Sequence, residues 1–136
     1  MFREFLVHHS KSLEFRAELI VLLVMADEKI GECEKKIIKE IAQEIYADEP
    51  NRANVLYETI HEFHEKITDH NSLDYSDLIN KIRNDIKKTP RFAKKINISQ
   101  LDRFRECIDN EEDKIFHDRI IEFLSNLRKE SMDGVL

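Results

Sequence analysis

Residues 19–34 read LIVLLVMADEKIGECE, and this stretch decides the fold. Its first half, Leu19 to Ala26, is the longest uninterrupted apolar run in the chain. A helix that is apolar on nearly all sides belongs in the middle of a bundle. We therefore expect a helix from about Ser12 to Met25 at the centre of an all-α fold. The apolar run is too short to span a bilayer, which takes about 20 residues.

The acidic residues that follow this run form a first elbow, residues 27–34, between two helical patterns. Gly31 can serve as the N-cap of the next helix, because glycine is tolerated there. Glu34 is then the third helical residue, and its carboxylate can accept a hydrogen bond from the Gly31 backbone N–H, which is half of a capping box. The same acids could instead hold a divalent cation. Capping and metal binding are both open for this elbow.

The rest of the chain is predicted to be helical, because apolar residues recur at helical spacing and strict two-residue alternation is absent. Two glycines and two prolines leave few breaks, and 136 residues suit one domain, residues 1–136. We expect a single compact bundle of six to seven helices with a flexible tail at 131–136. The expected helices cover residues 2–9, 12–25, 32–46, 50–68, 74 or 76–88, 97 or 99–108 and a last segment through 116–127, with a short turn at 91–95.

A second acidic elbow, residues 109–113, repeats the layout of the first near the C-terminus. Each half of the chain thus has a helix, an acidic elbow and a further helix. The similarity lies in the order of the elements and does not extend to individual residues, because the second elbow lacks an Ile-Gly pair. Two residue pairs can cap the helix that precedes it: Asn97 with Gln100, or Ser99 with Asp102.

The first elbow and the helix after it carry a family pattern, formed by Ala26-Asp27, Ile30, Gly31, Glu34, Ile37-Ile38 and Ile41-Ala42. It resembles the signature of the TerB-like family, a tellurite-resistance-associated helical domain that also occurs in a membrane-anchored J-domain co-chaperone. That signature is an apolar helix ending Ala-Asp-Gly-x-Ile, then a cap, a Glu and aliphatic pairs. The match covers residues 15–45. Glu28 stands where the family has Gly, and Gly31 where Ser or Thr is common.

The resemblance implies a helical interaction or adaptor module without a catalytic centre, within stress-response or membrane-associated complexes. It also implies acidic positions that bind a divalent metal, and Asp27 and Glu34 match those positions. We add the hypothesis that the second elbow meets the first across the bundle. The ions expected are Ca²⁺, Mg²⁺ or Mn²⁺, since these prefer oxygen ligands. The candidate ligands are Asp27, Glu28, Glu34, Asp109, Glu112 and Asp113.

Positive charge is concentrated in residues 81–95, which carry +6 in a chain of net charge −6. Lysines on helix exteriors usually form a solvated face, and this interpretation stays open. The alternative is a helical adaptor that docks an acidic protein, nucleic acid or an anionic lipid surface through this segment. The candidate partner-binding residues are Lys87, Lys88, Arg91, Lys94 and Lys95.

Enzymatic activity is not expected, because the sequence has no Gly-rich phosphate loop, no Gly-x-Ser-x-Gly and no His-Glu-x-x-His. Glu58-x-x-His61 is half of a di-iron motif, but there is no second copy. Both residues lie off the apolar stripe of their helix, so we expect them to face solvent, with His64 at the core boundary. Asp113 and His117 are spaced i,i+4, as an ion pair or half of a site.

The two cysteines, Cys33 and Cys107, form neither a Cys-x-x-Cys pair nor a zinc spacing. We expect them to be reduced structural thiols, as is usual in the cytosol. The sequence shows no signal-peptide pattern, so a cytoplasmic location is expected. The resemblance to the TerB-like family implies a protein partner.

Overall fold

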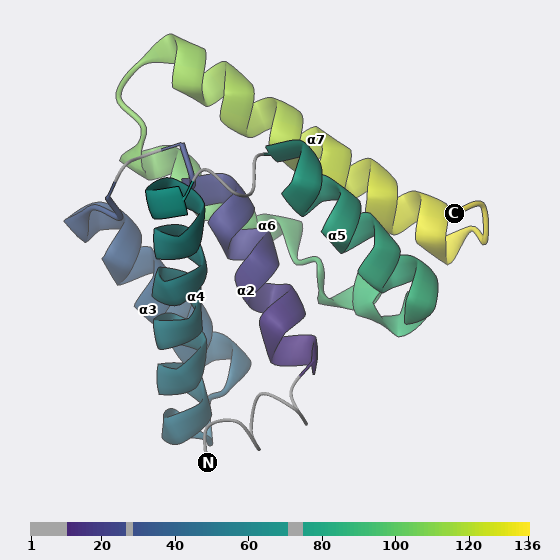
Figure 1. The fold of residues 1–136 in the computed structure, drawn as a ribbon, viewed down its shortest axis with the longest axis horizontal. Helices are drawn as coiled ribbons and strands as arrows, with labels where there is room; N and C mark the ends of the chain where they lie inside the picture. The colour runs from purple at the N-terminus through teal and green to yellow at the C-terminus, as the bar shows by residue number, and fades with distance from the viewer. Residues whose placement is uncertain (1–10, 27–28, 71–74) are drawn as a thin grey trace.

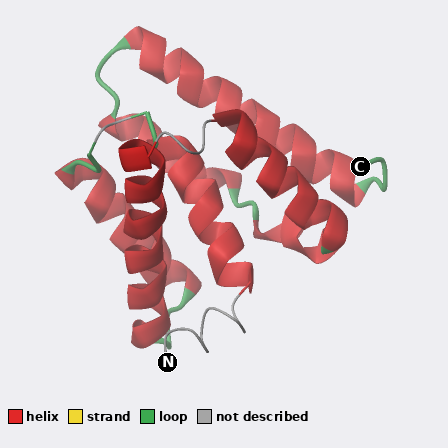
Figure 2. Cartoon of the chain, in the orientation of Figure 1, coloured by secondary structure: helices red, strands yellow, loops and turns green. Residues whose placement is uncertain are grey.

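The computed structural model describes residues 11–26, 29–70 and 75–136, and every regular element in these ranges is helical (Figure 1, Figure 2). The prediction of an all-α bundle is therefore confirmed. The helix expected at residues 2–9 lies outside the described residues. The elements are α2 (Lys11–Val24), α3 (Glu32–Ile45), α4 (Pro50–His70), α5 (Tyr75–Lys88), η1 (Pro90–Lys95), α6 (Ile98–Leu101), η2 (Asp102–Cys107) and α7 (Glu111–Met132), where η denotes a 3₁₀ helix.

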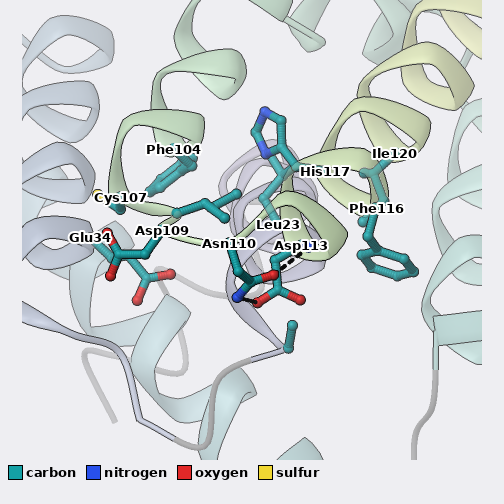
Figure 3. Close-up of a pocket in the computed structure, with 12 residues that line it drawn as sticks. Leu23, Glu34, Phe104, Cys107, Asp109, Asn110, Asp113, Phe116, His117 and Ile120 are labelled. Carbon is teal, nitrogen blue, oxygen red and sulfur yellow. Dashed lines mark hydrogen bonds between the residues drawn. The ribbon is translucent and has the colours of Figure 1, made fainter.

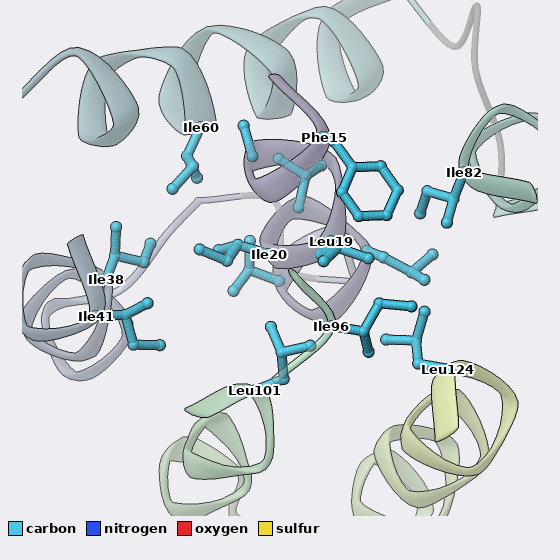
Figure 4. Packing of buried hydrophobic residues seen from close by; sticks show 14 of the residues in the cluster. Phe15, Leu19, Ile20, Ile38, Ile41, Ile60, Ile82, Ile96, Leu101 and Leu124 are labelled. Carbon is cyan, nitrogen blue, oxygen red and sulfur yellow. The ribbon is translucent and has the colours of Figure 1, made fainter. Parts of the chain in front are cut away.

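Helix α2 is buried around most of its circumference, because four consecutive residues, Leu19 to Leu22, are each at most 2% exposed. Four successive positions of an α-helix point in all directions around its axis. The covering elements are α4, α5, η1, α6 and α7, all of which contact α2. Figure 4 shows this arrangement, with side chains of α2 between those of the surrounding helices.

The helices around α2 each contribute an apolar stripe to one core. Helix α3 contacts α4, while α7 contacts α5, η1, α6 and η2. In Figure 1, α3 and α4 lie on one side of α2, and α7 lies on the opposite side. The expected stripe of α3 is confirmed, because Ile37, Ile38 and Ile41 are buried. The largest fully buried side chains are Phe15, Phe104, Leu13, Leu19, Ile20, Leu22, Ile38, Ile41, Leu56, Ile60, Ile82 and Ile86.

Two predicted helix caps are present. The Gly31 backbone N–H donates to Glu34 Oε1 at 3.0 Å, which satisfies a donor that the helix itself leaves unpaired. The Asn97 side chain accepts from the Gln100 backbone N–H at 3.2 Å, so this pair caps α6. The sequence predicted one α-helix up to residue 108. In the structure the α-helix ends at Leu101, and the chain continues as the tighter 3₁₀ helix η2.

The expectation of reduced thiols is wrong, because Cys33 and Cys107 form a disulfide. Cys33 lies in the first turn of α3 and Cys107 at the end of η2. Their Cα atoms are 5.7 Å apart although 74 positions separate them in sequence. Only the packing of the two elements brings the thiols together, and a separation of 74 positions does not predict such a bond.

No helix in the described part of the chain combines the length and the apolar character needed to cross a bilayer.

Reduction of the disulfide should lower the free energy of unfolding. In the chain-entropy view, a crosslink closing a loop of this length stabilises the folded state by roughly 4 kcal/mol. Urea unfolding followed by circular dichroism, with and without dithiothreitol, measures the difference. The Cys33→Ser/Cys107→Ser variant should unfold at the same urea concentration as the reduced protein, and dithiothreitol should not change its midpoint. An unchanged midpoint in wild-type protein, with both thiols shown to be reduced by alkylation, would contradict the stabilising role.

Candidate functional site

The two acidic elbows meet around one pocket of about 180 Å³, which we call the elbow pocket (Figure 3). Glu34 comes from the start of α3, whereas Asp109 and Asp113 come from the second elbow. The disulfide lies at the same place, because Cys107 also lines the pocket. No lysine or arginine is among its lining residues. The remaining wall is mostly apolar, from Leu23, Ala26, Phe104, Ile108, Phe116 and Ile120.

Three of the six predicted metal ligands therefore share a pocket. Glu112 does not line it, although it directly precedes Asp113 in the first turn of α7. Asp27 and Glu28 lie outside the described residues. The structure thus brings Glu34 together with Asp109 and Asp113, as expected from the echo between the two elbows, and it separates Glu112 from them.

Helix capping already uses part of the oxygen set of the pocket. Glu34 is 8% exposed and accepts from the Gly31 N–H, as described above. At the second elbow, Asn110 is the N-cap of α7: its Oδ1 accepts from the Asp113 N–H at 2.8 Å, while its Nδ2 donates to Asp113 Oδ2 at 2.8 Å. Figure 3 shows these two bonds, with Glu34 and Asp109 on the other side of the pocket. Capping and cation binding are compatible, since a carboxylate has about four lone-pair sites.

A second group of acidic and histidine side chains lies next to the pocket. Donor atoms of Asp102, His117 and Asp118 lie within 4.8 Å of one another. His117 Nε2 is 3.0 Å from Asp102 Oδ1, and the imidazole is buried. His117 thus bonds to Asp102 from η2, and not to Asp113, with which its i,i+4 spacing had made an ion pair one of two interpretations.

We interpret this second group as a structural ion-pair network. Arg105 Nε and Nη2 donate to the two oxygens of Asp118 at 3.0 and 3.4 Å, which compensates that carboxylate. The network fastens η2 to α7, and η2 carries Cys107 to the elbow pocket.

The structure also shows a buried carboxylate that sequence reasoning missed. Glu18 is 2% exposed within the apolar α2, and both of its oxygens accept from Lys81 Nζ at 3.1 Å. Lys81 Nζ also donates to Asp85 Oδ2 at 3.3 Å. Burial raises the pKa of Glu18 to about 8, a nearby Asp85 adds to the rise, and Lys81 opposes it. The available signal was an acidic residue directly before the apolar run Leu19 to Ala26.

The predicted partner-binding residues lie at the end of α5 and on η1. Lys87, Lys88, Arg91 and Lys94 are exposed, and Lys95 is half-buried. Arg91 and Lys95 both lie near the buried ring of Phe92, at 5.5 and 6.0 Å from its centroid. None of these five cations forms an ion pair with a carboxylate of the described residues.

Two histidines of α4, His61 and His64, are partly or fully buried in the bundle. His61 is half-buried, and its Nδ1 lies 3.0 Å from the Tyr57 carbonyl oxygen, whereas Glu58 is exposed. The expectation of a solvent-facing position thus holds for Glu58 and fails for His61. His64 was expected at the core boundary, but it is 4% exposed and therefore lies inside the core.

Comparison with protein-family models, with curated proteins and with solved structures found no match to this chain.

The buried Glu18 predicts a pH dependence of stability. In the unfolded chain a glutamate loses its proton near its ordinary pKa of 4.5, whereas the folded protein holds this proton until about pH 8. The folded state therefore binds the extra proton between these values, and the free energy of unfolding falls as pH rises through this window. The upper bound is about 5 kcal/mol, at about 1.4 kcal/mol per pKa unit.

Urea unfolding between pH 5 and pH 8 measures this dependence. Glu18→Gln should flatten the profile, because the amide stays neutral, and the exposed Glu58→Gln should keep the wild-type slope. A Glu18→Gln profile as steep as that of wild type would show that another group is responsible.

Proposed function

We propose that this chain is a non-catalytic helical interaction module of the TerB-like kind, which binds a divalent cation where its two acidic elbows meet. One observation carries the proposal: Glu34 from the first elbow and Asp109 and Asp113 from the second line the same pocket. Three carboxylates without a basic residue on the pocket wall form a region of negative potential. A bound divalent cation would relieve their mutual repulsion.

The geometry favours an ion that keeps part of its water shell. The described donor atoms of Glu34, Asp109 and Asp113 do not converge as closely as those of Asp102, His117 and Asp118. Mg²⁺ releases its waters reluctantly and is often held by one or two carboxylates, with waters completing its octahedral shell. Mn²⁺ accepts the same oxygen ligands. Ca²⁺ needs about six to eight oxygens at direct contact, for which the elbow carboxylates would have to rotate inward.

The interaction role is supported by apolar side chains beside the elbow pocket. Ile115 is 51% exposed and Phe116 38% exposed, and both lie in the first two turns of α7. Phe116 also lines the pocket, and its ring centroid lies 4.7 Å from that of Tyr75. Cation binding would change the electrostatic potential next to these residues. The affinity of a protein partner that covers them would therefore depend on whether the cation is bound.

The disulfide bears on where such a module would act. Disulfides persist in oxidising compartments, whereas cytosolic thiols are kept reduced. The cytoplasmic location expected from the sequence and the Cys33–Cys107 bond therefore disagree, and we propose an oxidising environment. Rapid alkylation of intact cells followed by mass spectrometry measures the state of the pair in place. Two freely alkylated thiols would restore the cytoplasmic expectation.

Cation binding should raise the thermal stability of the protein. A ligand that binds only the folded state at about 100 times its Kd adds about 2.7 kcal/mol to the free energy of unfolding. Thermal unfolding after chelation, with Mg²⁺, Mn²⁺ or Ca²⁺ added back, measures the shift in Tm. Asp109→Asn/Asp113→Asn should abolish the shift, and Asp27→Asn should reduce it.

A matched control is Glu111→Gln/Glu112→Gln, which removes the same charge from two acids of α7 that do not line the pocket. This variant should keep the wild-type shift. Equal loss in both double variants would indicate nonspecific screening, and the absence of a shift with all three ions would refute the cation site.

A further inference from the structure

One ring nitrogen of His117 is buried and has no hydrogen-bond partner. The imidazole comes from the second turn of α7 and is 3% exposed. Its Nε2 lies 3.0 Å from Asp102 Oδ1, whereas Nδ1 has no partner among the described residues. Most buried polar atoms in proteins do have a partner, because leaving one unpaired costs free energy. Nδ1 is therefore a buried donor or acceptor that a ligand from outside the chain would satisfy.

The bond to Asp102 determines what Nδ1 can bind. An ionised carboxylate only accepts hydrogen bonds, so Nε2 carries the proton that is donated to Asp102. In the neutral imidazole the lone pair then lies on Nδ1. Metal-bound histidines almost always donate their other ring N–H to a carboxylate, a carbonyl or water, which fixes the tautomer and the orientation of the ring. Asp102 and His117 have this arrangement, with Nδ1 as the nitrogen left for a metal.

His117 lines the elbow pocket together with the carboxylates of the proposed cation site. Asp113 precedes it by four residues on α7, so the two side chains lie on the same face of this helix. Figure 3 shows the imidazole beside Leu23, with Glu34 and Asp109 across the pocket from Asp113. The i,i+4 spacing of Asp113 and His117 thus fits the second of its two interpretations, half of a site. The pocket wall offers an imidazole nitrogen as well as carboxylate oxygens.

We infer that His117 Nδ1 is a metal ligand of the elbow pocket, and that this pocket prefers a first-row transition metal such as Zn²⁺ to Mg²⁺ or Ca²⁺. The inference rests on the proposed cation site and names the ion that suits it best. Mg²⁺ and Ca²⁺ take oxygen ligands, whereas imidazole suits Zn²⁺. Zn²⁺ is bound by four ligands, which include histidine nitrogen and carboxylate oxygen. His117, Asp113 and either Asp109 or Glu34 would supply three, with water as the fourth.

Water as a ligand agrees with the size of the pocket. The carboxylates of Glu34, Asp109 and Asp113 do not gather with His117 as closely as Asp102 and Asp118 do, so the protein alone does not form a closed shell. A cavity needs only about 10–15 Å³ to hold one water molecule. At about 180 Å³ the elbow pocket has room for an ion and several waters.

The neighbouring group of Asp102, His117 and Asp118 fits a metal less well, although its donor atoms lie within 4.8 Å of one another. Arg105 already donates to both oxygens of Asp118. An ion in this group would also have to displace the Nε2 proton and break the bond to Asp102. At Nδ1 a metal binds without either change, so the two positions can be told apart by mutation.

The test compares Zn²⁺ and Mg²⁺ binding to the full, oxidised chain by isothermal calorimetry. The disulfide stays intact, so that neither cysteine offers a thiolate to zinc. Wild-type protein should bind one Zn²⁺ at least tenfold more tightly than Mg²⁺. His117→Gln should weaken Zn²⁺ binding by roughly tenfold or more, the cost of disturbing a metal-bound histidine. It should leave the Mg²⁺ affinity unchanged, because Mg²⁺ uses the carboxylates; a general loss of structure would weaken both ions.

A second variant tests the positioning role of Asp102 without removing a buried ring. The Asp102 side chain is 52% exposed, so Asp102→Asn should fold. Its amide no longer fixes the tautomer of His117, and Zn²⁺ binding should weaken about tenfold while Mg²⁺ binding is kept. Asp118→Asn should retain Zn²⁺ binding. Loss of zinc in Asp118→Asn, with wild-type zinc affinity in Asp109→Asn/Asp113→Asn, would move the metal to the neighbouring group and overturn the inference.

Other histidines provide the controls. His61 is matched to His117, because its Nε2 is also buried without a partner among the described residues, yet it does not line the elbow pocket. His61→Gln should therefore keep the wild-type Zn²⁺ affinity. His8 and His9 lie outside the described residues, and His8→Gln/His9→Gln should keep it too. Loss of zinc binding in either control, with wild-type affinity in His117→Gln, would assign the ion elsewhere and overturn the inference.

The outcomes separate this inference from the cation site on which it rests. Wild-type Zn²⁺ affinity in His117→Gln, combined with loss of both ions in Asp109→Asn/Asp113→Asn, would show that Nδ1 bonds to water only. Mg²⁺ binding without a preference for Zn²⁺ would likewise overturn the ligand role of His117 and leave the cation site in place. Absence of binding by either ion to wild-type protein would refute both proposals.

Discussion

The burial of α2 on nearly every side is the constraint on which the rest of the structure depends. The second half of α2, from Leu19 on, has no polar residue and must be covered on all sides; α4, α5, α6, α7 and η1 all pack against this helix. The chain must also leave the core where α2 ends, and the first elbow provides that exit. Covering the same helix from the other side brings the second elbow close to the first. The elbow pocket and the disulfide therefore follow from how the chain wraps around α2.

Local features of this fold can be predicted from the sequence because short-range physics determines them. The aliphatic stripe of α3 follows from its helical spacing, and the bonds of Gly31 with Glu34 and of Asn97 with Gln100 follow from capping over three residues. The convergence of the elbows was inferred from their similar layout. Glu112 shows the limit of that inference, because it directly precedes Asp113 in α7 and yet does not line the pocket.

Long-range partners could not be predicted, because no local pattern encodes them. Cys33 meets Cys107 across 74 positions, and Glu18 meets Lys81 across 63. Each pairing depends on the path of the chain around the core. A proton bound at Glu18 and a reductant acting on the disulfide would therefore change the molecule at these two long-range contacts.

The most direct test of the account is whether one bound cation lies close to both elbows. Mn²⁺ is paramagnetic and broadens the NMR signals of nearby amides, so a titration of isotope-labelled protein maps its position. The account predicts simultaneous broadening at residues 31–35 and 107–114, with competition by Mg²⁺ and little effect on α4. Broadening at one elbow alone, or diffuse broadening at exposed acids throughout the chain, would contradict a shared site.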